Sequence, residues 1–344
     1  MTDIKSLTFE ELAGMMQGLN EPKFRTKQVY EWMHKKLASS FDEMTNLPKD
    51  LRQRLSDECE YTCLECVRVQ ESAEDGTKKF LFALSDGNLI ESVFMRYHHG
   101  NSVCISSQVG CRMGCKFCAS TIDGLVRNLT PAEMLDQIYR ITVITGERVS
   151  NVVIMGSGEP MDNYDNVLKF IRMISDENGL NISGRNITVS SCGIVPRIRE
   201  LAKEKLPVTL AISLHAPTDE KRKALMPIAN KYSLDELLEA CRYYYECTGR
   251  RISFEYALVE GVNDRDEEVK ELSSLLKGLN AHVNLIPVNP IKERDYRSTS
   301  RTNVLKFQNK LEKNGINVTI RREMGRDIEG ACGQLRRRHI KENI

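Results

Sequence analysis

The stretch Cys111-Arg112-Met113-Gly114-Cys115-Lys116-Phe117-Cys118 places three cysteines within eight residues. Thiolates at this spacing can hold three corners of a cubane iron–sulfur cluster and leave the fourth iron open. An open iron can bind the amino and carboxylate groups of S-adenosylmethionine, whereas a fourth local cysteine would complete an electron-transfer cluster. Gly110 and Gly114 let the backbone wrap tightly around such a group. The stretch therefore predicts a [4Fe-4S] cluster with the ligands Cys111, Cys115 and Cys118.

A second triplet, Cys59, Cys63 and Cys66, has the same spacing, so spacing alone does not identify the cluster site. This triplet contains no glycine, and the glutamates beside its thiolates should repel anionic sulfur. A structural zinc site is another alternative, but zinc usually takes four ligands in paired Cys-x-x-Cys clusters. The only other such pair is Cys63 and Cys66, far upstream. We therefore favour the downstream triplet as an iron–sulfur site.

Beyond about residue 102, short β-branched runs alternate with longer amphipathic segments, which is typical of a parallel sheet with crossover helices. We expect strands at 103–106, 151–155, 187–190, 208–213, 252–258, 282–287 and 318–320. We expect helices at 131–145, 166–175, 195–203, 234–247, 267–279 and 304–313. Thr130 with Glu133, and Ser233 with Glu236, match the cap-plus-acid signature of helix starts. The predicted fold class is α/β, with a partial (β/α) barrel of the TIM type.

The residues before this core predict two smaller units. Apolar residues recur at helical spacing from Phe9 to about Leu55. Alternating runs at 77–84 and 89–95 each follow an Asp-Gly turn and predict a short antiparallel element. We place a helical accessory domain at 1–58, a β connector at 59–96, and the core with its C-terminal extension at 97–344.

Composition excludes several classes of protein. The chain has 344 residues, of which 41% are hydrophobic and 28% charged, as in ordinary globular proteins. No run approaches the roughly 18 apolar residues of a membrane span, and no secretory signal is present, so we expect a cytoplasmic protein without membrane contact. A net charge of +1 excludes a uniformly basic protein but permits a local basic face. Eleven cysteines in a reducing compartment favour metal or redox chemistry over disulfides.

The loops that follow the strands of a (β/α) barrel meet at one face and carry its active site. Polar residues and glycines occur at these positions in the sequence, at Gly156 to Glu159, Ser190, Ser213 to His215, and Asn289. Each of them singly also suits a structural role, as a satisfied strand end or a turn residue. Their gathering at one predicted face favours a binding site.

Five motifs together resemble the RlmN/Cfr family of radical S-adenosylmethionine rRNA adenine methyltransferases. They are Cys104 to Cys111, Met155 to Pro160, Ser213 to Pro217, Leu225 to Ile228 and Ala331 to Leu335. The resemblance covers nearly the whole chain, including the N-terminal helical module. It implies a radical S-adenosylmethionine barrel that methylates carbon 2 of an adenosine in the peptidyl-transferase centre of 23S rRNA. Whether the adenosine 3′ to the anticodon in tRNAs is a further substrate stays open.

The resemblance also implies roles for single residues. Cys111, Cys115 and Cys118 would ligate the cluster. The pocket for S-adenosylmethionine would comprise Gly158, Glu159, Ser190, Ser213, Leu214, His215 and Asn289. Cys332 would be the thiol that is methylated first, Cys104 the thiol that resolves the RNA-linked intermediate, and Glu91 the proton acceptor.

In the family's scheme, each turnover consumes two S-adenosylmethionine molecules. One methylates Cys332, and the second is cleaved to a 5′-deoxyadenosyl radical that removes a hydrogen atom from the new methyl group. The resulting carbon radical adds to the base, a route that suits carbon 2 because this carbon is electrophilic. Deprotonation of the ring and attack by Cys104 release the methylated base and leave a Cys104–Cys332 disulfide, which must be reduced.

The predicted partners are RNA and an electron donor. Basic residues gather near Cys332 and in the helical module and could hold phosphates, although a solvated basic face is the alternative. They are Arg321, Arg322, Arg326, Arg336, Arg337, Arg338 and Lys341, and Lys23, Arg25, Lys27, Lys35 and Lys36. A flavodoxin- or ferredoxin-type protein would reduce the cluster, and we expect a monomer.

Two alternative functions stay open. Cfr-type enzymes use the same cysteines to modify carbon 8 of the same nucleotide and confer antibiotic resistance. Pro160 after Glu159 favours the carbon-2 type. A non-catalytic iron–sulfur or zinc RNA-binding module would leave Cys104, Glu91 and the glycine motif unexplained.

Overall fold

The computed structural model of the chain describes residues 1–287, 296–328 and 333–342. It contains a ten-stranded sheet in the order β14-β13-β12-β11-β10-β9-β6-β5-β4-β3. Its parallel strands are β6 (Gly100–Cys104), β9 (Asn151–Ile154), β10 (Ile187–Ser191), β11 (Thr209–Ser213), β12 (Ile252–Leu258), β13 (Ala281–Pro287) and β14 (Val318–Ile320). Each corresponds to a predicted strand. The α/β prediction of a partial barrel is confirmed, with β3 and β14 as the two edges of the sheet.

Three antiparallel strands continue the same sheet. They are β3 (Glu65–Glu71), β4 (Lys78–Ala83) and β5 (Leu89–Tyr97). Strand β5 pairs with β6, so that Val93 lies opposite Cys104. The segment predicted as a connector thus extends the barrel sheet and brings β5 beside its first parallel strand.

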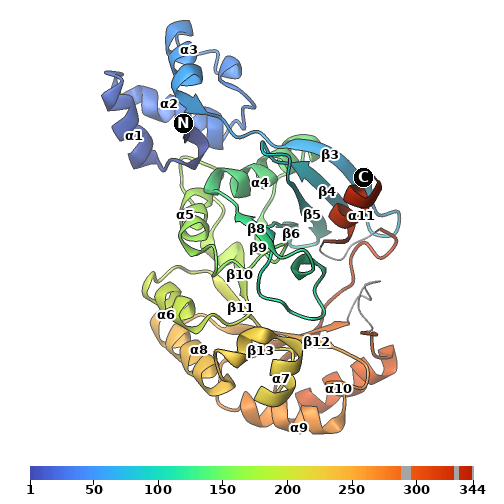
Figure 1. Cartoon of the computed structure of the whole chain (residues 1–344). Coiled ribbons are helices and arrows are strands. Elements are labelled where there is room, and N and C mark those ends of the chain that lie inside the picture. The colour runs from blue at the N-terminus through green and yellow to red at the C-terminus, as the bar shows by residue number, and fades with distance from the viewer. Residues whose placement is uncertain (288–295, 329–332, 343–344) are drawn as a thin grey trace.

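Helices lie along the outer side of the sheet (Figure 1). They are α4 (Pro131–Thr145), α5 (Tyr164–Ile174), α6 (Val195–Lys203), α8 (Leu234–Thr248), α9 (Asp266–Leu275) and α10 (Arg301–Lys313). Thr130 and Glu133 form a capping box at the start of α4, and Ser233 and Glu236 form one at the start of α8. Both caps confirm the predicted helix starts, because each satisfies backbone N–H groups that the first turn leaves unpaired.

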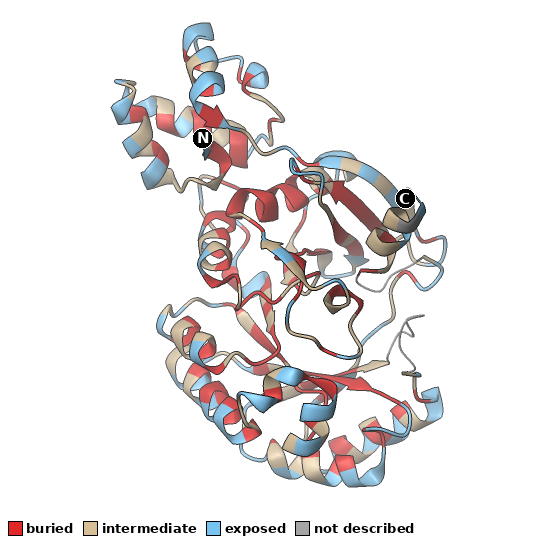
Figure 2. Ribbon diagram, in the orientation of Figure 1, coloured by how far each residue is buried: buried red, intermediate tan, exposed pale blue. Residues whose placement is uncertain are grey.

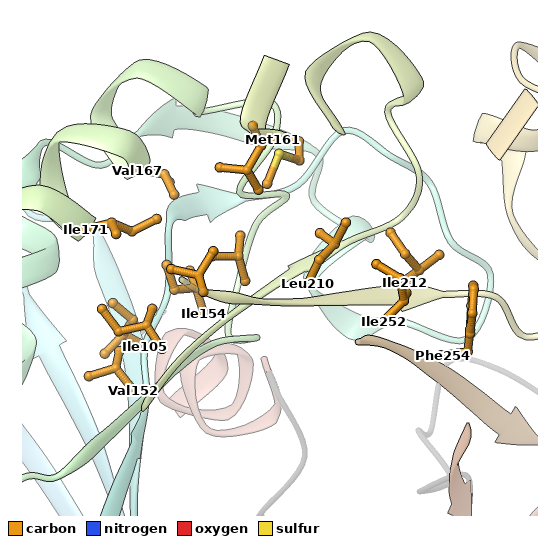
Figure 3. Packing of buried hydrophobic residues seen from close by; sticks show 14 of the residues in the cluster. Ile105, Val152, Ile154, Met161, Val167, Ile171, Leu210, Ile212, Ile252 and Phe254 are labelled. Atoms are coloured by element: carbon orange, nitrogen blue, oxygen red, sulfur yellow. The ribbon is translucent and has the colours of Figure 1, made fainter. Parts of the chain in front are cut away.

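The main hydrophobic core fills the space between the sheet and these helices, while exposed residues lie mostly on the outer helix faces (Figure 2). Figure 3 shows Val152 and Ile154 of β9 near Val167 and Ile171 of α5. Their neighbours Asn151 and Val153 are only half-buried. The apolar side chains of β9 that pack against α5 therefore lie on one face of the strand, and the opposite face is available to line a binding site.

The N-terminal module has its own core and forms a lobe at the top of Figure 1. Its helices are α1 (Phe9–Gly18), α2 (Lys23–His34) and α3 (Lys49–Glu58), and the short strands β1 (Thr2–Asp3) and β2 (Cys59–Glu60) pair beside them. Lys5 Nζ lies 2.8 Å from Asp136 Oδ1 of α4, and both side chains are only 1% exposed. His34 Nδ1 lies 2.8 Å from the hydroxyl of Tyr139 on the same helix. Buried polar contacts thus fix the module to α4.

No helix within the described ranges has both the length and the apolar character needed to cross a membrane.

Candidate active site

A cavity of about 520 Å³ opens where the parallel strands end. Its volume is in the range of small-molecule pockets. Among the predicted site residues, those that line it are Cys104, Cys111, Cys115, Cys118, Gly158, Glu159, Ser190, Ser213 and His215. The structure thus brings residues from five separate segments to one face, as the barrel argument required.

The cysteine loop joins β7 (Gln108–Gly110) to β8 (Leu125–Asn128), which pair in antiparallel fashion. Gly110 has a φ of 76°, and a Cβ atom there would collide with the carbonyl oxygen of Gly124. The backbone N–H of Cys111 donates to that carbonyl at 2.9 Å. On the other side, Lys116 N donates to Leu225 O at 2.9 Å. The loop is therefore closed at its base by a backbone contact that requires glycine at position 110, and it is joined to Leu225 by a second backbone bond.

The thiols of this loop are poorly hydrated. Cys111 and Cys115 are buried and Cys118 is half-buried. Burial, together with the charge of Cys118, raises the pKa of the Cys111 thiol to about 12, and burial raises the pKa of Cys115 as well. A cationic metal centre replaces the thiol protons and removes this penalty. The chemistry of the loop therefore fits a group that binds three thiolates at once.

The arrangement of the thiols agrees with a cluster. Within the described ranges, no three His, Cys, Asp or Glu side chains are arranged to hold a single metal ion. A cubane binds each cysteine to a different iron, so its ligands surround the cluster and do not converge on one atom. Cys111, Cys115 and Cys118 lining one cavity suit this geometry.

The glycine motif after β9 depends on close backbone packing. Gly158 has a φ of 108°, and a Cβ atom there would lie 2.6 Å from Cβ of Gln108. Glu159 N donates to Gln108 Oε1 at 2.8 Å. The Glu159 carboxylate accepts N–H bonds from Met161 at 3.0 Å and from Cys192 at 2.7 Å, while burial raises its pKa. Glu159 thus ties the loop after β9 to the segment after β10.

His215 follows β11 in a left-handed conformation, with a φ of 56°. Its Nδ1 accepts the N–H of Ala257 at 2.9 Å, and its carbonyl accepts a bond from Asn263 Nδ2 at 2.7 Å. Burial and the charge of Arg222 lower the pKa of His215 to about 3. The ring is therefore neutral, carries its proton on Nε2, and can donate a hydrogen bond without bringing charge.

The neighbouring Leu214 has a different environment. Its side chain packs into the main core and does not line the cavity. Its backbone N–H donates to Glu255 O at 3.0 Å. A contact between Leu214 and a ligand would have to involve its backbone.

Glu91 and Cys104 lie on the paired strands β5 and β6, and Cys104 lines the cavity whereas Glu91 is not among its lining residues. The Glu91 carboxylate accepts N–H bonds from Gly333 at 2.7 Å and Arg336 at 2.6 Å, at the start of α11 (Gln334–Glu342). Cys104 is buried, and burial raises its pKa while the charges of Arg321 and Lys79 oppose the rise. The predicted site residues Asn289 and Cys332 lie outside the described residues.

Sequence reasoning missed three side chains at this site. Gln108 supports the glycine motif, Lys79 contacts Glu91 at 3.1 Å, and Arg222 is buried beside the cysteine loop. Lys79 lies on a strand buried on both faces, where alternation gives no signal. Arg222 belongs to the run Asp219-Glu-Lys-Arg-Lys223, which is typical of an exposed surface. No local pattern marks either cation as buried.

Comparison with known proteins gives two family models that match consecutive parts of the chain. Residues 2–61 match the N-terminal domain of ribosomal RNA large subunit methyltransferases. Residues 105–273 match the radical SAM superfamily. The two matches correspond to the helical module and to most of the barrel.

Curated relatives match over the full length. A protein from Lachnospira eligens named "Probable dual-specificity RNA methyltransferase RlmN" is 70% identical over 99% of this chain and 98% of its own. A protein of the same name from Clostridium novyi is 55% identical over 100% of both chains. A crystal structure of a radical SAM methyltransferase from Sphaerobacter thermophilus is 42% identical, with a TM-score of 0.93 over 97% of this chain and 99% of that one.

Proposed function

Because this chain belongs to the RlmN family of radical S-adenosylmethionine RNA methyltransferases, we propose that it methylates carbon 2 of an adenosine in the peptidyl-transferase centre of 23S rRNA. We propose the adenosine 3′ to the anticodon in tRNAs as its second substrate. The dual-specificity name of the relatives supports two classes of RNA, and their RlmN name favours carbon 2 over the carbon-8 chemistry of Cfr-type enzymes.

The position of Cys104 in the cavity of the cysteine triplet supports this proposal. Cys104 lines the cavity, and Val93, two residues after Glu91 on β5, lies opposite it. Glu91 and Val93 share one face of β5 because side chains alternate along a strand. A simple cluster-binding module would need neither group at this position.

The cofactor end of the cavity is assigned to the cluster and S-adenosylmethionine. The cluster, bound by Cys111, Cys115 and Cys118, supplies the electron that cleaves S-adenosylmethionine. Gly158 opens room for the cofactor backbone, while Ser190, Ser213 and neutral His215 offer hydrogen bonds from the strand ends. Glu159 holds two of these loops together and adds a carboxylate for the amino group.

The RNA end of the cavity is assigned to the two-cysteine chemistry. Cys332 carries the methyl group, Glu91 takes up the proton from the base, and Cys104 attacks Cys332 to release the product and form a disulfide. Exposed Arg321, Arg322 and Arg326 lie at the mouth of the cavity and could hold phosphates around a base turned out of its stack.

We further propose that a flavodoxin- or ferredoxin-type protein supplies the electron, and that the enzyme acts as a monomer in the cytoplasm beside its RNA substrates. The buried contacts of Lys5 and His34 with α4 support a helical module that moves with the barrel and adds its basic face to the same RNA surface.

The test is to react Cys104→Ala with S-adenosylmethionine, a reductant and a 23S rRNA fragment. We expect an intact cluster, cofactor cleavage and a covalent protein–RNA adduct, because the resolving thiol is missing. The double variant Cys104→Ala/Cys332→Ala should form no adduct, and Cys66→Ala should behave as the wild type. Full turnover by Cys104→Ala without an adduct would contradict the assigned role.

A further inference from the structure

Arg222 is a fully buried arginine of α7 (Asp219–Leu225). Its Nη2 donates to the carbonyl oxygens of Cys192 at 2.6 Å and Ser213 at 3.3 Å. Its Nε and Nη1 are buried and have no hydrogen-bond partner in the part of the chain that the structure describes. Within the described residues it forms no ion pair, so its charge is met only by two carbonyl dipoles.

A buried cation of this kind is unfavourable unless an anion lies near it. Burial lowers the pKa of Arg222, and negative charge on Cys192 or Cys115 would oppose this shift. Cys115 is one of the proposed cluster ligands, so a bound cluster would place thiolate charge where Arg222 interacts with it.

The helix that carries Arg222 packs directly against the cysteine loop. The bond from Lys116 N joins the loop to Leu225 O at the end of α7. A Cβ atom on Gly114 would lie 3.3 Å from Cγ of Pro227, just beyond the helix. Cys115, Cys192, Leu225 and Met226 form one buried apolar cluster between the two elements. Charges separated by such a dry layer interact much more strongly than charges in water.

We propose that Arg222 is a positioning residue that raises the reduction potential of the cluster. The inference rests on the proposed function, since it requires a [4Fe-4S] cluster at Cys111, Cys115 and Cys118. Thiolates and sulfides give such a cluster net negative charge, and reduction adds one more negative charge. A fixed buried cation therefore stabilises the reduced form more than the oxidised form. The two nitrogen atoms of Arg222 without a hydrogen-bond partner among the described residues are consistent with a charge that acts through space.

A purely structural role makes a different prediction. If Arg222 only braced the carbonyls of Cys192 and Ser213, its loss would weaken folding or cluster retention but would not change the potential of those clusters that remain. The midpoint potential separates the two roles, because it is measured on intact clusters only.

The experiment compares the midpoint potential of the reconstituted full-length wild type with that of Arg222→Gln and Arg222→Met, by redox titration followed by EPR. Iron and sulfide content is measured on the same samples. Each neutral variant should lower the ratio of reduced to oxidised cluster about tenfold at a fixed potential, which is about 59 mV for one electron. Arg222→Lys keeps the charge and should stay closer to the wild type. Lys223→Gln is the matched control on the same helix and should not shift, because Lys223 is exposed and screened.

Each outcome decides the proposal. A neutral variant that has a full cluster and an unchanged midpoint potential would overturn the role of Arg222. A midpoint potential in Arg222→Lys as low as that in Arg222→Gln would overturn it too. Both results would leave the proposed function intact. If both neutral variants lose the cluster, retention of the cluster in Arg222→Lys supports the need for a positive charge at position 222. Loss of the cluster in Arg222→Lys as well would overturn the proposal. A wild type that binds no cluster would refute the proposed function itself.

Discussion

The ammonium group of Lys79 lies 3.1 Å from the carboxylate of Glu91, and the two side chains are 0% and 7% exposed. The same carboxylate accepts the backbone N–H groups of Gly333 and Arg336. A carboxylate at the start of a helix is favourable, because the first N–H groups have no partner within the helix. Glu91 thus joins strands β4 and β5 to the start of α11, which packs against β5 (Figure 1).

Lys79→Met should destabilise the protein strongly. Removing one partner of a buried ion pair leaves the other charge unpaired, which typically costs about 3–5 kcal/mol. The control is Lys78→Met on the same strand, because Lys78 pairs with Glu71, whose side chain is 53% exposed. That change should cost less than about 1 kcal/mol. Urea unfolding measures both, and equal losses for the two variants would contradict a structural role for the Lys79–Glu91 pair.

Gly158→Ala should weaken the binding of S-adenosylmethionine about tenfold or more, because left-handed strain and a clash typically cost about 1–3 kcal/mol. The new Cβ atom would meet Gln108, which supports Glu159. Gly146→Ala is the matched control, since Gly146 also has a positive φ of 68°, but no described residue beyond its chain neighbours has an atom within 4 Å of its Cβ position. Equilibrium dialysis of the reconstituted variants gives the affinities, and equal affinity in both would argue against a pocket beside Gly158.

The buried His34 should make folding sensitive to acid. Burial and the charge of Lys5 lower the pKa of His34 to about 3, against about 6.5 in an unfolded chain. The unfolded state therefore binds one more proton between these values, and stability should fall as the pH drops below about 6.5, by up to about 1.4 kcal/mol per pH unit.

This acid sensitivity should be smaller in His34→Phe, which has no group to protonate at that position. Urea unfolding of wild type and variant from pH 7.5 to 5.0 gives the difference. Above about pH 7 the two curves should run parallel, since the histidine is then neutral in both states. Parallel curves over the entire range would show that His34 titrates normally in the folded protein.

Cys111→Ala should abolish cluster binding, whereas Cys66→Ala should retain about four irons per chain. Cys66 belongs to the upstream triplet with identical spacing. This pair of variants therefore tests whether the cluster binds to the downstream triplet or to any triplet with this spacing. Iron analysis and the charge-transfer absorption after anaerobic reconstitution provide the measurement. Equal iron content in the two variants would remove the assignment of the cluster to the downstream loop.

Local signals made much of the fold predictable. Helices α4 and α6 have the predicted bounds, and α4 is set by a capping box and a C-terminal glycine, which act within one turn. The placement of Lys79 and Arg222 could not be predicted in this way. Both are fully buried. The fold alone brings each to its partners, which are the carboxylate of Glu91 for Lys79 and the carbonyl oxygens of Cys192 and Ser213 for Arg222.

The candidate site was predictable to the extent that its residues follow strand ends. Glycines and polar residues at the ends of β9, β10 and β11 do line one cavity. Leu214 shows the limit of that reasoning, because a residue between two cavity-lining neighbours has its side chain in the core. Adjacent residues at the end of a strand point to opposite faces, and sequence position alone does not tell which face holds the ligand.

The most direct test of the proposed activity is mass spectrometry of RNA nucleosides after anaerobic reaction of the reconstituted protein with S-adenosylmethionine, dithionite and unmodified 23S rRNA or tRNA. We expect 2-methyladenosine in both RNAs, and none when Cys111→Ala replaces the wild type. Formation of 8-methyladenosine, or of no methylated adenosine despite an intact cluster, would contradict the assignment of this chain as a carbon-2 methyltransferase.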